Sequence, residues 1–302
     1  MKILFTGGSG LLAANWALFI RDTINVSLAL HKRAIYLERV QCFYINLESL
    51  DSISQHMAFI RPDIVVHAAA LTDVDKCEFN PALAKLINTV MAINVATVCA
   101  SYKCLFIHIS TDHLHDGQRT FVREFEPVSP INQYGLTKAA AEAGILEVLP
   151  KALIIRTNFF WWGPWYRPSF SDWILQALRQ RQQLNMFVDV YYTPISIHAL
   201  IRTIELLINA NAHGVYNVVS NERISKFEFG LMIANHFGLD AKLITPTTLR
   251  DTAKLVMRPL DMSLSNNKLR DSLMITLPTL DDQIAYMKQC EFTPERVMLT
   301  CL

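Results

Sequence analysis

The chain has 302 residues, of which 51% are hydrophobic and 18% are charged. This composition indicates a globular protein with a substantial core, large enough for one big domain or two modest ones. The net charge of +1, without long blocks of like charge, gives no indication of binding to nucleic acid or to an acidic membrane.

The cysteine pattern and the N-terminal segment indicate the cellular compartment of the protein. The six cysteines are scattered and form no C-x-x-C pair, which favours reduced, buried thiols over disulfides or zinc, so we expect no metal. Glycines interrupt the first apolar residues, which therefore resemble neither a membrane helix nor a signal peptide. We expect a cytoplasmic protein.

The first twenty residues predict a strand, a glycine turn and a helix. Residues 2–6 are largely apolar, Gly7-Gly8-Ser9-Gly10 follows, and residues 11–20 are helix-like. Glycine lets the backbone approach a phosphate, and the first helical N–H groups point at the anion. The G-x-x-G-x-x-A spacing is wider than the usual dinucleotide fingerprint, and an ordinary tight turn is the alternative. The cofactor-binding residues expected here are Gly7, Ser9, Gly10, Leu11 and Leu12.

The second predicted strand, residues 25–30, ends in His31-Lys32-Arg33. A carboxylate at this point would bind the ribose hydroxyls of NADH, whereas basic groups accommodate the 2′-phosphate of NADPH. The sequence therefore favours NADPH, with Lys32 and Arg33 as phosphate contacts. A solvated basic loop is the alternative, and NADH stays open as a second cofactor.

Two further strand ends carry candidate cofactor contacts. Asn46 and Leu47 follow a third apolar run at residues 41–45 and fall where an adenine pocket would lie. A helix over residues 49–60 precedes a strand that ends in Ala68, Ala69 and Ala70. Small side chains at the carboxyl end of a strand leave room for a ligand, although tight packing alone would also explain them.

The remaining elements of this half continue the alternation. A polar loop at residues 71–78 precedes a helix over 81–102 and a strand over 104–109, which ends in Ser110-Thr111-Asp112. A loop over 113–130, a helix that begins at Pro130 and a strand over 152–157 follow. Alternating strands and helices predict βαβ units and a doubly wound parallel sheet of the Rossmann type. We expect residues 1–157 to form an NAD(P)-binding domain.

The alternation becomes sparser after residue 157. An aromatic segment over 159–168 leads to a helix over 169–182 and a strand over 186–191. Helices over 196–209 and 225–237 flank a strand over 215–219. This pattern predicts a smaller C-terminal α/β domain, residues 158–302, that mainly binds the substrate and is interleaved with the last strands of the sheet.

Tyr134 and Lys138 are the candidate catalytic pair. They lie four residues apart on a predicted helix and therefore on one face of it. A tyrosine with a pKa near 10 is a poor acid or base at neutral pH, and a nearby ammonium lowers that pKa. Thr111, at the end of a strand, would add a hydroxyl that stabilises developing charge.

Together these stretches resemble the short-chain dehydrogenase/reductase superfamily, in its extended branch that modifies sugar nucleotides, and within it the dTDP-4-dehydrorhamnose reductases. The likeness extends to about residue 289, and only the combination of motifs is specific. The matching stretches are residues 6–12, 67–78, 110–112, 134–138, 156–157 and 193–195, with Arg258, Pro259, Ser263, Leu264 and Lys268.

The resemblance implies hydride transfer from a nicotinamide to the 4-keto group of a nucleotide-linked 6-deoxysugar. In that scheme Tyr134 protonates the developing alkoxide and Thr111 hydrogen-bonds the carbonyl oxygen. Lys138 lowers the tyrosine pKa and holds the nicotinamide ribose. The resemblance also implies a nucleotide-sugar partner and leaves a homodimer open. The substrate-binding residues that it implies are Thr72, Val74, Asp112 and Phe159.

The chain departs from the family pattern at two aromatic positions. His113-Leu114-His115 stands where the family has Tyr-Val-Phe, so these histidines either change the substrate pocket or fill the same volume. Phe159 replaces a tryptophan, with Trp161 and Trp162 close behind, and these rings either stack on a sugar or base or belong to the core.

Two other functions stay open at this point. The family also resembles the regulatory beta subunit of methionine adenosyltransferase, which keeps the cofactor fold without serving as a reductase. The other alternative is an epimerase or dehydratase of the same superfamily. A dehydratase is disfavoured because it needs an added acidic residue, and Asp112 is followed here by His113.

Overall fold

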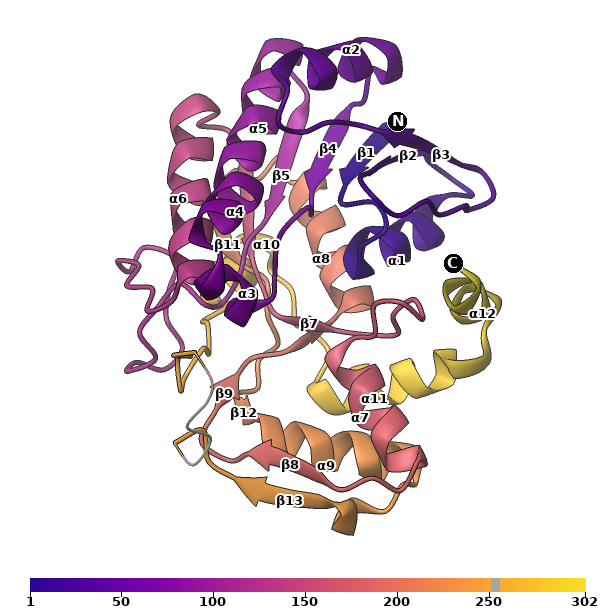
Figure 1. The fold of residues 1–302 in the computed structure, drawn as a ribbon, viewed down its shortest axis with the longest axis vertical. Helices are drawn as coiled ribbons and strands as arrows, with labels where there is room; N and C mark the ends of the chain where they lie inside the picture. Colours follow the sequence, from indigo (N-terminus) through magenta and orange to yellow (C-terminus); the bar gives the residue numbers. More distant parts are fainter. Residues whose placement is uncertain (251–255) are drawn as a thin grey trace.

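A computed structural model of the chain describes residues 1–250 and 256–302. At the centre of this described part lies a sheet of seven parallel strands (Figure 1). The order changes direction between β1 and β4, and ligands of open α/β sheets bind at such a switch point. This is the doubly wound Rossmann-type sheet that the alternation predicts. In spatial order the strands are β11 (Gly214–Asn217), β6 (Leu153–Arg156), β5 (Leu105–Ile109), β4 (Ile64–His67), β1 (Lys2–Thr6), β2 (Asn25–Leu30) and β3 (Val40–Tyr44).

Helices cover both faces of the sheet because successive strand side chains point to opposite faces. Ile3 and Phe5 of β1 belong to the cluster with α1 (Leu11–Ile20) and α8 (Ile197–Asn209). Leu4, between them, belongs to the cluster on the other face. The helices of that second face are α2 (Leu50–Ile60), α5 (Met91–Tyr102) and α6 (Gln133–Val148).

The helix predicted over residues 81–102 is present but is not uniform. It consists of α4 (Pro81–Lys85), a π-helical turn at Leu86–Val90, and α5. By length and composition the whole run, Pro81–Tyr102, would suffice to cross a membrane. A core helix meets the same criteria, and α5 contacts α2, α6, β4 and β5.

The prediction of a polar loop over residues 71–78 is wrong. The segment contains the short helix α3 (Val74–Phe79), whose N-cap is Asp73. The Asp73 side chain accepts a hydrogen bond from the Lys76 backbone N–H at 3.0 Å. An aspartate at this position is an N-cap signal that outweighs the polar composition of the segment.

Beyond β6 the chain builds a second group of elements below the sheet (Figure 1). Short strand pairs lie between this group and the sheet, namely β7 (Phe159–Phe160) with β10 (Ile195–Ser196) and β9 (Tyr191–Tyr192) with β12 (Ile224–Ser225). The second group comprises α7 (Phe170–Arg179), β8 (Leu184–Phe187), α9 (Lys226–Phe237), β13 (Ile244–Thr247) and α11 (Leu280–Gln289). In chain order, α8 and β11 come between β8 and α9 and belong to the sheet and its covering helices.

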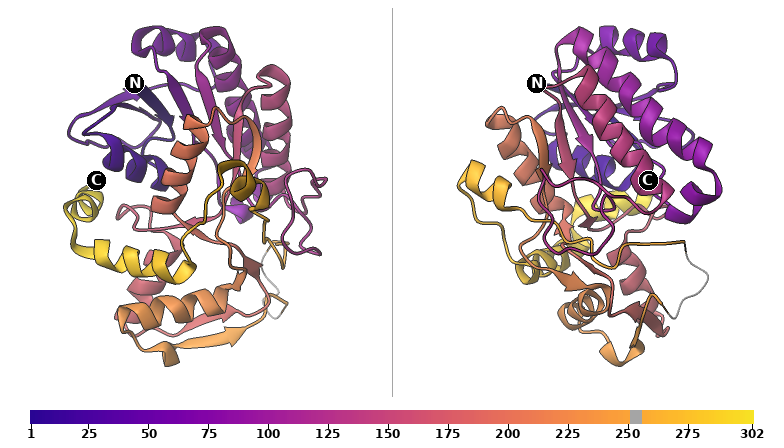
Figure 2. Two further views of the ribbon diagram at one scale, coloured as in Figure 1. Left: turned by 180° about the vertical axis from the view of Figure 1, so that it is seen from behind. Right: turned by 90° about the vertical axis from the view of Figure 1, so that its left-hand side faces the viewer.

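The predicted elements of this region occur with small shifts, the strand expected over 186–191 being β8 and that over 215–219 being β11. The later elements were not predicted from the sequence. These are η2 (Ala241–Leu243), β13, α10 (Asn267–Leu273), α11, η3 (Cys290–Phe292) and α12 (Pro294–Cys301). The last helix, α12, contacts α1, so the C-terminus lies beside the first helix (Figure 2). One continuous apolar cluster joins β1 and α1 to α7, α9 and α11.

Candidate active site

The glycine turn forms a cradle between β1 and α1. Gly7 has a φ of +67°, and a Cβ there would lie 2.8 Å from the Ala69 backbone. Gly10 donates its N–H to the Gly7 carbonyl at 2.7 Å and is the N-cap of α1 without a side-chain cap. The first N–H groups of α1 are therefore open to an anion, and its first turn carries no acidic side chain.

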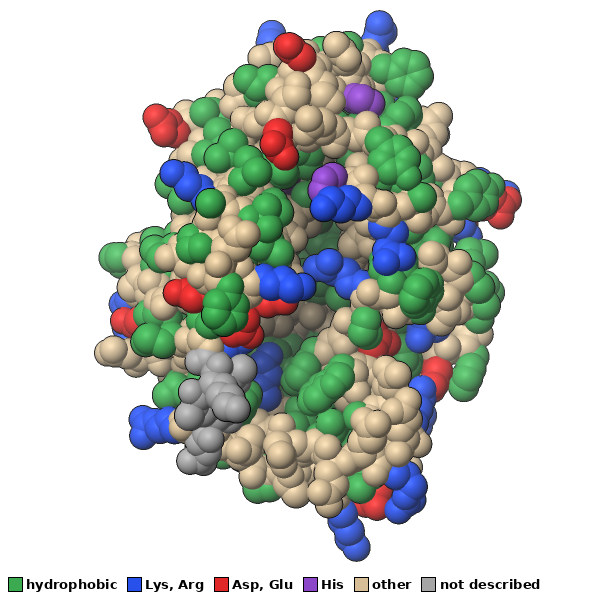
Figure 3. Space-filling view, in the orientation of Figure 1, with side chains coloured by type: hydrophobic (Ala, Val, Ile, Leu, Met, Phe, Trp, Pro, Cys, Tyr) green, Lys and Arg blue, Asp and Glu red, His purple; other side chains and the backbone are tan. Residues whose placement is uncertain are grey.

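A cavity of about 830 Å³ extends from this cradle along the carboxyl ends of β1, β4 and β5. Figure 3 shows the hollow in the face of the molecule, with Lys and Arg side chains around it. Most residues singled out in the sequence line this cavity. They are Gly7, Ser9, Gly10, Leu11, Leu12, Asn46, Leu47, Ala68, Ala69, Ala70, Thr72, Thr111, Asp112, Tyr134, Lys138 and Phe159.

Three expected contacts do not line the cavity. Val74 packs behind Tyr134, in the small apolar cluster with Cys77. Lys32 and Arg33 are exposed at the end of β2. The Arg33 guanidinium lies over the Tyr166 ring, 4.1 Å from its centroid.

Tyr134 and Thr111 meet at the carboxyl end of β5. Helix α6 begins at Gln133 rather than Pro130, because the Asn132 side chain caps it by accepting from the Gly135 N–H at 2.9 Å. A Cβ at Gly135 would lie 2.3 Å from the His113 carbonyl oxygen, so glycine lets the first turn approach the loop after β5. Tyr134 is buried beside Thr111.

The protonation of Tyr134 differs from the expectation. Burial raises the pKa of the Tyr134 phenol well above its usual value, and the hydrogen bond with Thr111 and the charge of Arg167 only partly oppose this shift. Lys138 is not among the groups that shift it. In this structure Tyr134 is therefore a neutral phenol at physiological pH.

Lys138 is buried, and its ammonium contacts the sheet. It donates to the Ile109 carbonyl at 2.7 Å and lies 2.9 Å from Nε2 of His108. Burial lowers the pKa of Lys138 to about 7, against an opposing effect of Glu142. The Glu142 carboxylate is itself bound by the buried Arg156 guanidinium at 2.8 Å.

His67 and His108 extend this polar contact across the sheet, and sequence reasoning missed both. Their rings stack with centroids 5.4 Å apart, and Nδ1 of His67 lies 2.8 Å from the Thr6 hydroxyl. Thr6, His67 and His108 are register partners on β1, β4 and β5. A polar residue near the end of each of three neighbouring apolar strands was the signal available in the sequence. Burial lowers the pKa of both imidazoles, and of His67 to about 3.

Of the residues that depart from the family pattern, some line the cavity and others do not. His113 lines the cavity, with its ring edge-on to Tyr134 at a centroid distance of 5.4 Å, whereas His115 is not part of the lining. Trp161 and Trp162 are 2% exposed and belong to the core, and the indole N–H of Trp162 donates to the Met287 carbonyl at 2.9 Å. Phe159 alone of these aromatic residues faces the cavity.

Within residues 1–250 and 256–302, no group of three or more His, Cys, Asp or Glu residues is arranged to hold a metal ion. The donor groups that line the cavity include backbone N–H groups, hydroxyls and the side chains of Lys76, Lys138 and Arg167. This donor set suits the phosphates and ribose of a dinucleotide.

Comparison with known proteins gives consistent matches over most of the chain. The family model for the RmlD substrate binding domain matches residues 1–290. A probable low-salt glycan biosynthesis reductase, Agl14 of Haloferax volcanii, is 31% identical over 75% of this chain and 77% of its own length. The dTDP-4-dehydrorhamnose reductase of Escherichia coli is 28% identical over 76% of this chain and 79% of its own length.

Solved structures share the fold. A hypothetical dTDP-4-dehydrorhamnose reductase from Sulfolobus tokodaii matches with a TM-score of 0.82 and 29% identity, covering 94% of this chain and 99% of that one. The dTDP-4-dehydrorhamnose reductase of Bacillus anthracis, solved in complex with NADP, also matches with a TM-score of 0.82. Its identity is 24%, over 95% of this chain and 98% of that one.

Proposed function

Since the chain belongs to the family of the RmlD substrate binding domain, we propose that it is an NADPH-dependent reductase of the 4-keto group of a nucleotide-linked 6-deoxysugar. The observation that carries this proposal is the contact of Tyr134 with Thr111 in the same cavity as the glycine cradle of α1. A proton donor and a hydroxyl partner beside a dinucleotide cradle are the parts that carbonyl reduction requires.

The residues present fit the dinucleotide. A Cβ would fill the cradle at Gly7 and Gly10, and the first N–H groups of α1 are available to the diphosphate. When bound, the cofactor supplies the hydride. Asn46 and Leu47 would contact its adenine, and Ala68 to Ala70 leave room along the end of β4.

Arg33 would hold the 2′-phosphate of NADPH. Its guanidinium already lies over Tyr166, whose hydroxyl donates to the Ser9 carbonyl at 3.0 Å, so the two side chains adjoin the glycine cradle. Lys32 adds a second charge at the same strand end. The positive charges of Lys32 and Arg33 would attract a phosphate bound here.

Tyr134 acts as the proton donor. Burial raises its pKa, which keeps the phenol protonated until the alkoxide forms on the substrate. Thr111 hydrogen-bonds the carbonyl oxygen, and this interaction strengthens as negative charge develops there. In this structure the Thr111 hydroxyl donates to the Asp112 carboxylate at 3.2 Å, and it would turn this proton to the carbonyl oxygen when the substrate binds.

Lys138 holds the nicotinamide ribose. Two contacts of its ammonium are made within the protein, to Ile109 and His108, and Lys138 also lines the cavity, which leaves one N–H for a ribose hydroxyl. His108 is a positioning residue in this scheme, because it fixes the ammonium without touching either ligand.

We place the substrate in the part of the cavity toward the second group of elements, whose Phe170 belongs to the lining. Thr72, Asp112 and Phe159 line that side of the cavity, and Val74 supports Tyr134 from behind. We assign cofactor binding to residues 1–157, and substrate binding mainly to residues 158–302.

The test is NADPH oxidation with a dTDP-4-keto-6-deoxysugar generated in situ, followed by the nicotinamide absorbance. We expect turnover by the wild type and a large loss in Tyr134→Phe. Tight binding of NADPH without oxidation in the presence of several keto-sugar nucleotides would contradict the reductase and favour a regulatory subunit.

A further inference from the structure

Residues 163–169, here called the strap, connect β7 to α7 and contact both sides of the cavity. On one side the Tyr166 hydroxyl donates to the Ser9 carbonyl of the glycine turn at 3.0 Å. On the other side the Arg167 guanidinium donates to the Thr72 hydroxyl, after β4, also at 3.0 Å. The strap therefore lies at the mouth of the cavity.

One carboxylate oxygen closes the base of the strap. Oδ2 of Asp172, in the first turn of α7, accepts from the Gly163 N–H at 2.7 Å and from the Ser169 N–H at 2.9 Å. A Cβ at Gly163 would lie 2.5 Å from the Arg167 carbonyl oxygen, so this turn requires glycine. The two ends of the strap are thus fixed to each other.

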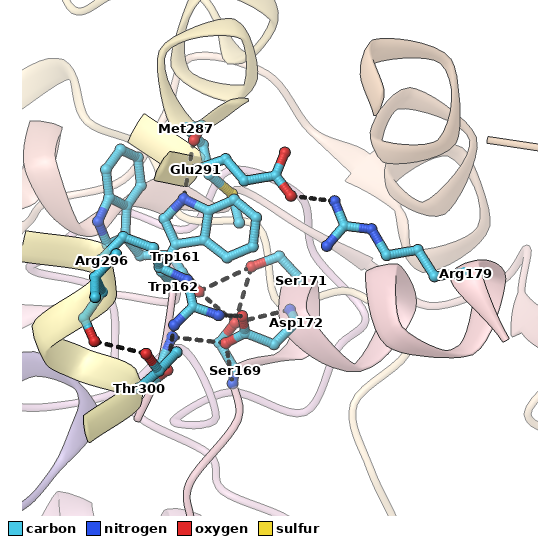
Figure 4. Close-up of polar contacts among 12 residues, drawn as sticks. Trp161, Trp162, Ser169, Ser171, Asp172, Arg179, Met287, Glu291, Arg296 and Thr300 are labelled. Atoms are coloured by element: carbon cyan, nitrogen blue, oxygen red, sulfur yellow. Dashed lines mark hydrogen bonds and ion pairs between the residues drawn. The ribbon is translucent and has the colours of Figure 1, made fainter. Parts of the chain in front are cut away.

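The C-terminal helix supports this base (Figure 4). The Arg296 guanidinium of α12 lies 4.0 Å from Asp172 and 4.8 Å from the centroid of the Trp162 ring, and it donates to the Gly163 carbonyl at 3.4 Å. Figure 4 also shows Glu291 paired with Arg179 of α7. Residues 291–302 lie beyond those that the family model matches.

Arg167 of the strap has N–H donors beyond the one that binds Thr72. Lys76, another cation of the lining, is paired with Asp73 at 3.5 Å, and Lys138 is held by the sheet. Arg167 is exposed, and in the part of the chain that the structure describes it has no carboxylate partner. A guanidinium carries five N–H donors in a planar fork that matches phosphate oxygens in pairs.

We propose that Arg167 binds the diphosphate group of a nucleotide ligand at the mouth of the cavity, and that Asp172 positions it there by closing the base of the strap. Two ligands of the proposed function carry a diphosphate, the sugar nucleotide and the dinucleotide. The contact with Thr72 places Arg167 on the side assigned to the sugar nucleotide, and the glycine cradle already serves the dinucleotide. The inference rests on the proposed function for the identity of these ligands.

Equilibrium binding tests the proposal without turnover. The probes are dTDP, thymidine and NADPH, titrated into wild type, Arg167→Ala and Arg167→Lys. Losing hydrogen bonds to a charged group costs about 10-fold or more in affinity, so Arg167→Ala should weaken dTDP binding by about this factor and leave thymidine unchanged. Arg167→Lys should recover part of the loss because it keeps the charge. The exposed Arg270 of α10 provides a control, since Arg270→Ala removes the same charge outside the cavity.

The outcomes distinguish the two sources. Weaker binding of dTDP with unchanged NADPH assigns Arg167 to the sugar nucleotide, and the reverse assigns it to the dinucleotide. Unchanged binding of both, or an equal loss for thymidine, would overturn the proposal. A failure of turnover with the keto sugar would refute the proposed function and leave these binding results standing.

A double-mutant cycle tests the positioning role of Asp172. Alanine has no oxygen to accept the Gly163 and Ser169 N–H groups, so Asp172→Ala should open the base of the strap and weaken dTDP binding several-fold. In Arg167→Ala the same change should have no further effect, because residues that act as one unit are not additive. A purely structural role would instead lower thermal stability and weaken thymidine binding equally in both backgrounds, and that result would refute positioning.

Discussion

Replacing His108 with leucine should move the pH dependence of cofactor binding. In the wild type the pKa of Lys138 is about 7, and its ammonium has two partners in the protein, Ile109 and His108. A hydrogen bond to a charged group is worth about 1.5–3 kcal/mol, which corresponds to about one to two pKa units. Leucine removes one acceptor, so the pKa of Lys138 should fall by about that amount.

The sign follows from the proposed function, in which the charged form of Lys138 binds the ribose. The contribution of Lys138 to wild-type NADPH affinity should be constant below its pKa of about 7. Above it, affinity should fall by up to about tenfold per pH unit, because an ever smaller fraction of Lys138 carries the proton. In His108→Leu the decline begins about one to two units lower, so the variant binds about 10-fold or more weakly at pH 7.

The assay is a fluorescence titration of NADPH at pH values from about 5 to 9. The 2′-phosphate of NADPH also titrates in this range, with a pKa near 6, but its effect on binding is the same for every variant. His108→Gln supplies an amide oxygen as acceptor and should restore most of the wild-type profile. His213→Leu, which removes an exposed imidazole, should change nothing. One pH profile shared by wild type and His108→Leu would refute the assignment of His108.

Three further predictions concern the remaining parts of the site. Tyr134→Phe should lower turnover by about 10²-fold or more while NADPH affinity stays within a few fold, since it removes only a general acid; unchanged turnover would exclude Tyr134 from the mechanism. Gly10→Val should abolish NADPH binding in a folded protein, because even a Cβ lies 2.9 Å from the Gly7 carbonyl oxygen, and normal binding checked with circular dichroism would contradict the position of the cradle. Arg33→Ala should raise the dissociation constant for NADPH and leave that for NADH nearly unchanged, and an equal loss for both would remove the 2′-phosphate from its role.

Local signals account for what the sequence predicts well. The glycine turn follows from glycines between an apolar strand and a helix, and the structure needs them at Gly7 and Gly10. Thr111 follows β5 and Tyr134 lies in the first turn of α6, so both lie at the edge of the sheet where its parallel strands end. Spacing along the chain and the rule for parallel sheets suffice for both.

Contacts between distant elements account for what the sequence does not predict. Lys138 contacts Ile109 and His108 of β5, and only the packing of α6 on the sheet determines that choice. Arg33 binds the ring of Tyr166 because the strap returns to the end of β2, 133 residues later in the numbering. A lone polar residue in an apolar strand, such as His67, carries too weak a signal to reveal its register partner.

The C-terminal elements could not be predicted for a related reason. Helix α12 docks on α1 and on the base of the strap through single side chains, of which Arg296 makes three contacts. Its eight residues have no strong apolar periodicity, and only Leu299 among them is buried. Such an element depends on the tertiary structure that it joins.

We propose that this chain transfers hydride from NADPH to a keto sugar nucleotide with Tyr134 as proton donor. The most direct measurement is the rate of NADPH oxidation with dTDP-4-keto-6-deoxysugar for wild type and Tyr134→Phe in parallel, at equal occupancy by NADPH. We expect steady oxidation by the wild type and a rate at least about 10²-fold lower for the variant. Equal rates for the two proteins, or no oxidation by a wild type saturated with NADPH and sugar nucleotide, would contradict it.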